Sequence, residues 1–270
     1  MQISIPLIVT LVTLALYLAS LVVLVMQITA RNPSVAPLFR ILFGCSVISH
    51  IAFLNFHVFP NQQLHVDFFR VSSLIFCVIS LFAFLAILRK LPIENLLVIL
   101  FPLTMIGISV GEWVETPSPK VITDKGVMTH ILLSIICYSL ITLASVQAVA
   151  LAAQDYLLKR HTFGGIFRYL PPLQTMEKLL FEMTWIGFVL LTLSIASGFL
   201  FLENMFAQHL VHKTLFSILA WIIFAILLYG RHTRGWRGIS AAVWTIVGFV
   251  LLMLGYFGSK LVLELILQRG

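Results

Sequence analysis

Long apolar runs separated by short polar connections dominate the sequence. Each run is close to the roughly 20 residues that an α-helix needs to cross a bilayer. The predicted spans are residues 3–26, 37–58, 69–88, 93–110, 128–156, 184–202, 215–229 and 241–257. The pattern predicts an all-α fold, a polytopic membrane helix bundle of about eight transmembrane helices. We expect residues 1–270 to form a single transmembrane domain.

The stretch Leu170–Gly198 combines two different patterns. Its first part carries Glu177, Lys178 and Glu182 among apolar residues at helical spacing, whereas its second part is an uncharged run. The apolar residues of the first part are Leu173, Met176, Leu179, Leu180 and Met183. This arrangement predicts an amphipathic helix that lies along the membrane interface and leads into the sixth span.

Composition agrees with this pattern and excludes some functions. The chain is 60% hydrophobic and 10% charged, and its mean hydropathy is +1.07. Its polar surface is too small to cover a soluble domain, so lipid must cover most of it. No basic, aromatic-rich soluble face is present, so no nucleic-acid partner is expected. Cys45, Cys77 and Cys137 all fall within spans and form no CxxC pair, which argues against a disulfide carrier.

The basic residues indicate how the spans are oriented. One set of connections contains Arg31, Arg40, Arg89, Lys90, Lys159, Arg160, Arg168, Lys178, Arg231, Arg234 and Arg237. The other contains Arg70, Lys120, Lys125, Lys213, Lys260 and Arg269. The richer side is predicted to be cytoplasmic. An even number of spans then places both termini on the extracytoplasmic side, together with an ordered loop at residues 111–126.

Histidines are the most informative candidate site residues. His50 lies within the second span, near mid-bilayer at about 1.5 Å per residue from Arg40, where an ionisable group indicates a functional site. A neutral imidazole bonded to Ser46, Ser49 or a neighbouring helix is the alternative. His130 opens the fifth span and is otherwise typical of an interfacial residue. The remaining histidines are His57, His65, His161, His209, His212 and His232.

The sequence resembles the CcsA-like cytochrome c assembly family of haem-handling membrane proteins, and within it the HemX and YpjD branch. The resemblance rests on three stretches, FGCSVISHIAFLNFHVFP, the helix that begins MTHILLSIICYSL, and the region that contains GWRG at 235–238. It implies that His50 and His130 are haem-iron ligands. An orientation signal in a tight turn accounts for Arg234 and Arg237. The functional alternative is that these arginines meet haem propionates or anionic lipid headgroups from the cytoplasmic side.

The sequence departs from the family pattern at three places. The connection ENMFAQHLVHK contains no tryptophan where haem-presenting members have a tryptophan-rich segment, and no histidine follows the last span. Tyr229 stands in register where a histidine is expected, and His232 follows three residues later. Tyr229 or His232 is then the ligand expected opposite His50, although His232 differs from it in depth by about 10 Å.

We therefore expect a multi-pass protein of the bacterial inner (plasma) membrane that binds or handles haem. It would support cytochrome c assembly or haem homeostasis without attaching haem itself, and it is not expected to be an enzyme. The expected cofactor is b-type, non-covalent haem. Expected partners are lipid, haem and other membrane or cytochrome-assembly proteins. Two alternatives stay open: a non-catalytic scaffold or regulator with a decayed haem site, and an outer-face divalent metal handler that uses the outer histidines.

Overall fold

The computed structural model describes residues 5–30, 33–60, 63–114, 120–160, 170–201 and 211–258. Among these residues, eight helices are long and apolar enough to cross a membrane, which confirms the polytopic helix bundle. The chain divides into two compact units, Met1–Thr123 (unit 1) and Asp124–Gly270 (unit 2). The single domain over residues 1–270 and the extracytoplasmic location of both termini stay predictions.

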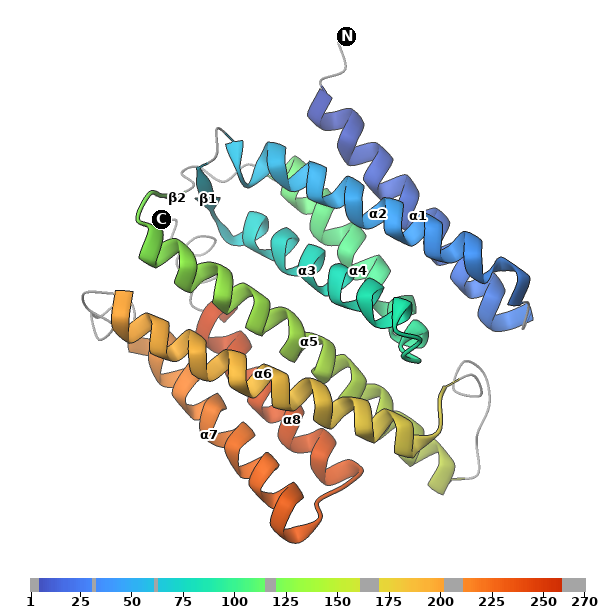
Figure 1. Ribbon diagram of the computed structural model, residues 1–270, viewed down its shortest axis with the longest axis vertical. Helices are drawn as coiled ribbons and strands as arrows, with labels where there is room; N and C mark the ends of the chain where they lie inside the picture. The colour runs from blue at the N-terminus through green and yellow to red at the C-terminus, as the bar shows by residue number, and fades with distance from the viewer. Residues whose placement is uncertain are drawn as a thin grey trace. The chain divides into compact units, whose positions relative to one another are not determined.

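Unit 1 contains four of these helices and a short strand pair (Figure 1). The helices are α1 (Ile5–Ala30), α2 (Ala36–His57), α3 (Phe68–Leu88) and α4 (Glu94–Trp113). α1 and α3 each pack against both α2 and α4. A 3₁₀ turn, Pro33–Val35, precedes α2, and β1 (Leu64–Val66) pairs antiparallel with β2 (Lys120–Ile122). The expected outer loop at 111–126 is therefore partly regular, because α4 continues to Trp113 and β2 begins at Lys120.

Unit 2 contains the other four helices, which follow the same cyclic order of neighbours. They are α5 (Lys125–Lys159), α6 (Leu173–Phe201), α7 (Val211–Arg234) and α8 (Ile239–Met253), with a π-helical turn at Leu254–Gly258. α5 and α7 each pack against both α6 and α8. α6 is one uninterrupted helix alongside α5 (Figure 1). Each unit is thus a four-helix bundle in which consecutive helices are neighbours.

Local sequence explains several helix ends. Asp67 caps α3 by accepting a hydrogen bond from the backbone N–H of Arg70 at 2.8 Å, and Asp124 caps α5 through Val127 at 2.7 Å. The turn between α7 and α8 has Gly235 at φ +64° and Gly238 at φ +55°. Residues with a side chain rarely adopt positive φ values, so glycine at both positions allows the chain to form this tight turn.

The amphipathic start of the sixth span differs from the sequence prediction. Residues 173–182 do not form a separate helix along the interface, because α6 continues through them to Phe201. Met176, Leu179 and Leu180 are buried within unit 2. Their apolar stripe therefore faces neighbouring helices, where packing satisfies it as well as lipid would.

Candidate functional site

His130 lies in the first turns of α5, where it contacts the last turns of α6. Its Nδ1 atom lies 2.9 Å from Ser197 Oγ and 3.1 Å from the backbone oxygen of Ser194. The ring is partly buried, and no described residue forms a hydrogen bond with Nε2. One edge of the imidazole is thus held by α6 while the other is available.

The partners of His130 fix its tautomer. The backbone oxygen of Ser194 can only accept a hydrogen bond, so Nδ1 must carry the proton. The hydroxyl of Ser197 donates to that same oxygen at 2.7 Å, so its Oγ accepts from Nδ1. Nε2 of a neutral His130 therefore carries a lone pair. An imidazole held at one nitrogen and free at the other is the form that binds metal ions in proteins.

Neighbouring contacts hold α5 and α6 together around His130. Ser134 Oγ lies 2.7 Å from Ser194 Oγ, one turn deeper along the same interface. At the helix ends the ring of Phe201 lies over Gly126, where an added Cβ would come within 2.6 Å of Phe201 Cδ1. A side chain at residue 126 would therefore displace this ring. Helix contacts on both sides of His130 along α5 therefore hold the backbone that carries the imidazole.

His50 lies inside unit 1 and has a different environment. Its Nδ1 lies 3.1 Å from Tyr17 Oη and its Nε2 lies 3.1 Å from Ser73 Oγ, so both ring nitrogens are bonded. The residue is 0% exposed. Ser46 and Ser49, the expected local partners, bond instead to Ser20 and Thr13 of α1. In this arrangement His50 could bind a haem iron only if Tyr17 or Ser73 released one ring nitrogen.

A polar face of α1 accounts for this arrangement. Thr10, Thr13, Tyr17 and Ser20 recur at helical spacing and are fully buried. Thr10 Oγ1 donates to Glu112 Oε2 at 2.7 Å, and His57 Nε2 lies 2.8 Å from the same oxygen. The spacing is visible in the sequence, but in so apolar a run it does not by itself indicate a buried polar face.

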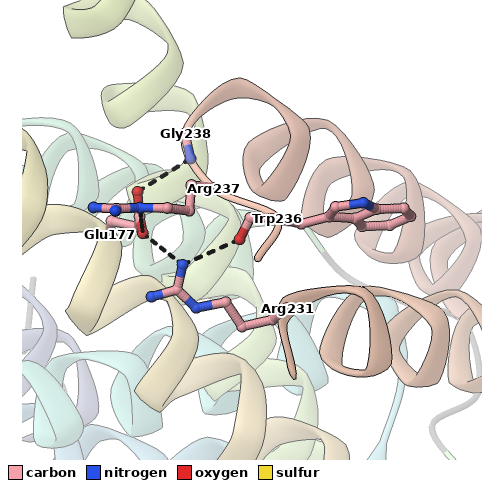
Figure 2. Close-up of polar contacts among 5 residues, drawn as sticks. All are labelled: Glu177, Arg231, Trp236, Arg237 and Gly238. Carbon is pink, nitrogen blue, oxygen red and sulfur yellow. Dashed lines mark hydrogen bonds and ion pairs between the residues drawn. The ribbon is translucent and has the colours of Figure 1, made fainter. Parts of the chain in front are cut away.

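Glu177, near the start of α6, is the centre of a polar network (Figure 2), whereas His130 contacts the last turns of the same helix. Its carboxylate accepts hydrogen bonds from Arg231 Nη1 at 2.9 Å, Arg237 Nε at 3.0 Å and the backbone N–H of Gly238 at 3.1 Å. Arg231 also donates to the backbone oxygen of Trp236 at 3.1 Å. The network joins α6 to the turn between α7 and α8.

The other predicted site residues of unit 2 also lie at this end. Tyr229, His232 and Arg234 are exposed, and Arg237 bonds to Glu177. Glu177 and Ser197 mark the two ends and are separated along α6 by about 30 Å at 1.5 Å per residue. The structure thus does not bring these four residues to His130, and His50 belongs to the other unit.

Sequence reasoning missed Glu177 and Arg231 as a pair, and Ser194 and Ser197 as partners of His130. In the sequence, Glu177 belongs to an amphipathic stretch and Arg231 to a basic connection, and both serines fall within an apolar span. Among the described residues no three histidine, cysteine or acidic side chains converge on a metal site. His161 and His209 lie outside the described residues.

Eight apolar helices, with polar side chains gathered on their buried faces, define a multi-pass membrane protein. A family model described as cytochrome C assembly protein matches residues 35–267, and the chain belongs to this family. The chain is 38% identical to inner membrane protein YpjD of Escherichia coli over 141 residues, which are 52% of this chain and 53% of that protein.

Two further relatives carry names from the branches expected from the sequence. Protein HemX of Brevibacillus brevis is 26% identical over 149 residues, 53% of this chain and 55% of that protein. Cytochrome c biogenesis protein CcsA of Mesostigma viride is 24% identical over 249 residues, 81% and 80% of the two chains. The matches to YpjD and HemX span about half the length of those relatives. No solved structure matches the chain.

Proposed function

We propose that this protein handles haem in the membrane, in support of cytochrome c assembly or haem homeostasis, and does not attach haem itself. The observation that carries the proposal is His130, whose Nδ1 is anchored by Ser194 and Ser197 and whose Nε2 has no hydrogen-bond partner in the part of the chain that the structure describes. Membership of the cytochrome c assembly family supports haem over other metal centres. The proposed membrane is the inner membrane of a bacterium, because one relative is the inner membrane protein YpjD of Escherichia coli.

In the proposed contact, Nε2 of His130 would hold the iron of a b-type, non-covalently bound haem. Haem supplies an iron that accepts a neutral imidazole nitrogen. Ser197 and Ser194 orient the ring and keep the Nδ1 proton in place, which leaves the lone pair of Nε2 pointing away from α6. Bonds of this kind to the non-ligating nitrogen raise the basicity of a ligand, so they should strengthen binding.

His50 is the secondary candidate ligand in this proposal. It becomes a ligand only if Tyr17 or Ser73 releases one ring nitrogen, since both are bonded. Tyr229 and His232, the proposed ligands opposite His50, are exposed at the polar end of unit 2, and so is Arg234. Because Arg237 bonds to Glu177 about 30 Å from the His130 end, Arg234 and Arg237 are proposed to meet propionates only of a haem other than the one at His130.

One structural observation favours a second candidate function. A haem site lost from unit 1 would leave a buried histidine with both nitrogens bonded inside the protein, as His50 is. The second candidate is therefore a non-catalytic membrane scaffold or regulator. The outer-face metal handler is weaker, because the described histidines do not converge.

The absorption spectrum of the protein purified in detergent tests the proposal. Haem-loaded protein should show a Soret band at a fixed haem-to-protein ratio after gel filtration. A colourless protein that stays colourless when haem is added would contradict haem handling and favour the scaffold. A colourless protein that instead binds zinc or copper in a titration would favour the metal handler.

A further inference from the structure

Two neighbouring clefts flank the Glu177 network at the polar end of unit 2. They have volumes of about 440 Å³ and 370 Å³, and both are lined by Gln174, Glu177 and Arg237. The larger cleft is also lined by Lys178, Trp185 and Arg231. It therefore has charged residues and an aromatic side chain in one opening, and the proposed haem contact at His130 involves neither cleft.

The larger cleft has more positive than negative side chains. Arg231, Arg237 and Lys178 line it, against the carboxylates of Glu177 and Glu182. Glu177 already accepts from two arginines and a backbone N–H. Its charge is therefore more than balanced, and the cleft carries an excess positive charge.

Arg237 has donors to spare. Only its Nε bonds to Glu177, and no described residue bonds to its two Nη groups. The side chain is 61% exposed. Lys178 is 77% exposed, and its only described ion pair is a long one to Glu182 at 3.8 Å. Fixing Nε on Glu177 holds the guanidinium in place, so its remaining N–H groups are oriented to bind an anion.

Further along α6 the lining of the cleft becomes apolar. Trp185 and Ile186 line the cleft and are 53% and 56% exposed. They lie about two turns beyond Lys178 on α6, roughly 10 Å along the axis. Tryptophan is typical of the level where headgroups meet acyl chains. The side chains that line the cleft thus change from cationic to apolar over a distance comparable with the glycerol region of a lipid.

We propose that this cleft binds an anionic phospholipid. The phosphate accepts from the Nη groups of Arg237 and from Lys178, and an acyl chain lies along Trp185 and Ile186. Basic clefts between membrane helices are suited to such headgroups. The apolar wall favours a lipid over a small soluble anion, which would gain nothing from it.

Native mass spectrometry in detergent tests the proposal without haem. The wild-type protein is titrated with phosphatidylglycerol and with phosphatidylcholine of the same acyl chains. Phosphatidylglycerol should bind preferentially, and K178Q should lower that preference about fivefold, the effect of one cation near a headgroup. The double variant E177Q/R237Q removes the arginine together with its buried partner and should lower the preference at least as much.

R160Q is the matched control, because Arg160 is exposed at the end of α5 and lines neither cleft. It should bind both lipids like the wild type. Equal binding of the two lipids by the wild type, or an equal loss in R160Q, would overturn the proposal. K178Q keeps the test valid if the double variant fails to fold, since Lys178 makes only an exposed contact.

Two competition arms separate the sources of the anion. Phosphatidylglycerol should stay bound in millimolar inorganic phosphate, and displacement would assign the cleft to small anions instead. It should also stay bound when haem is added. Displacement by haem that K178Q abolishes would assign the cleft to propionates and overturn the lipid proposal. None of these outcomes bears on His130, which lies at the other end of unit 2.

Discussion

The imidazole of His130 in α5 is anchored on Ser197 of α6, with 2.9 Å between Nδ1 and Oγ. Ser197 in turn donates to the backbone oxygen of Ser194, which fixes the direction of both hydrogen bonds. The protonated nitrogen of His130 thus faces α6, and the unprotonated one has no hydrogen-bond partner among the described residues. This relationship leaves Nε2 of His130 as the atom that we propose to bind haem iron.

Replacing Ser197 by Ala tests the anchoring. Loss of the hydroxyl leaves only the Ser194 oxygen to hold Nδ1, so haem should bind about 10- to 100-fold more weakly while the protein stays folded. Haem titration followed at the Soret maximum measures this. S134A is the matched control, because Ser134 contacts Ser194 but not the ring. Equal weakening in both variants would mean that the serines act through packing alone.

Replacing His50 by Ala separates a ligand from a packing residue. The change leaves Tyr17 Oη and Ser73 Oγ without their partner in a fully buried site. The free energy of unfolding should fall by about 1–3 kcal/mol. Thermal unfolding in detergent measures this, with S72A as control, since Ser72 bonds only within its own helix. A stable H50A protein that had lost its haem would instead identify His50 as the ligand.

The Glu177 network should hold α6 to the turn that follows α7. Replacing Glu177 by Ala leaves two guanidinium groups and the Gly238 N–H without their acceptor. Because both arginines are partly solvated, unfolding should become easier by about 1–2 kcal/mol rather than by the full cost of a buried ion pair. E182A removes a carboxylate with only a 3.8 Å contact, and its melting temperature should match the wild type. Equal melting temperatures for both variants would contradict the structural role.

The sequence predicted the number and placement of the helices, because a run of about 20 apolar residues is typical of a transmembrane helix. It could not separate lipid-facing from protein-facing residues. Leu180 illustrates this: it was expected at the membrane interface and is fully buried in unit 2. Helical periodicity gives the apolar stripe of a segment but not the partner that covers it.

The candidate site was predictable in part for a similar reason. A histidine at the start of a span was visible, but its serine partners lie more than sixty residues away in the chain. Glu177 was visible as a charge in an amphipathic stretch. Its arginine partners come from the far end of α7 and the turn beyond it. Such pairs follow from the packing of helices, which local pattern does not specify.

Topology remains a prediction that reporter fusions can check. Fusions after Arg89, Arg160 and Arg237 should report the cytoplasm, because the basic residues gather in those connections. Fusions after Lys120 and Gly270 should report the outer side. A cytoplasmic signal at Gly270 would contradict eight spans with both termini outside.

The haem content of H130A tests the central claim most directly. The wild type, H130A and H232A are purified in the same detergent, and the haem-to-protein ratio and Soret spectrum of each are measured. H232A is the control, because His232 is exposed at the opposite end of unit 2. H130A should lose haem or shift its Soret band, and H232A should keep the haem that H130A loses. A folded H130A protein with the haem stoichiometry and spectrum of the wild type would contradict ligation by His130.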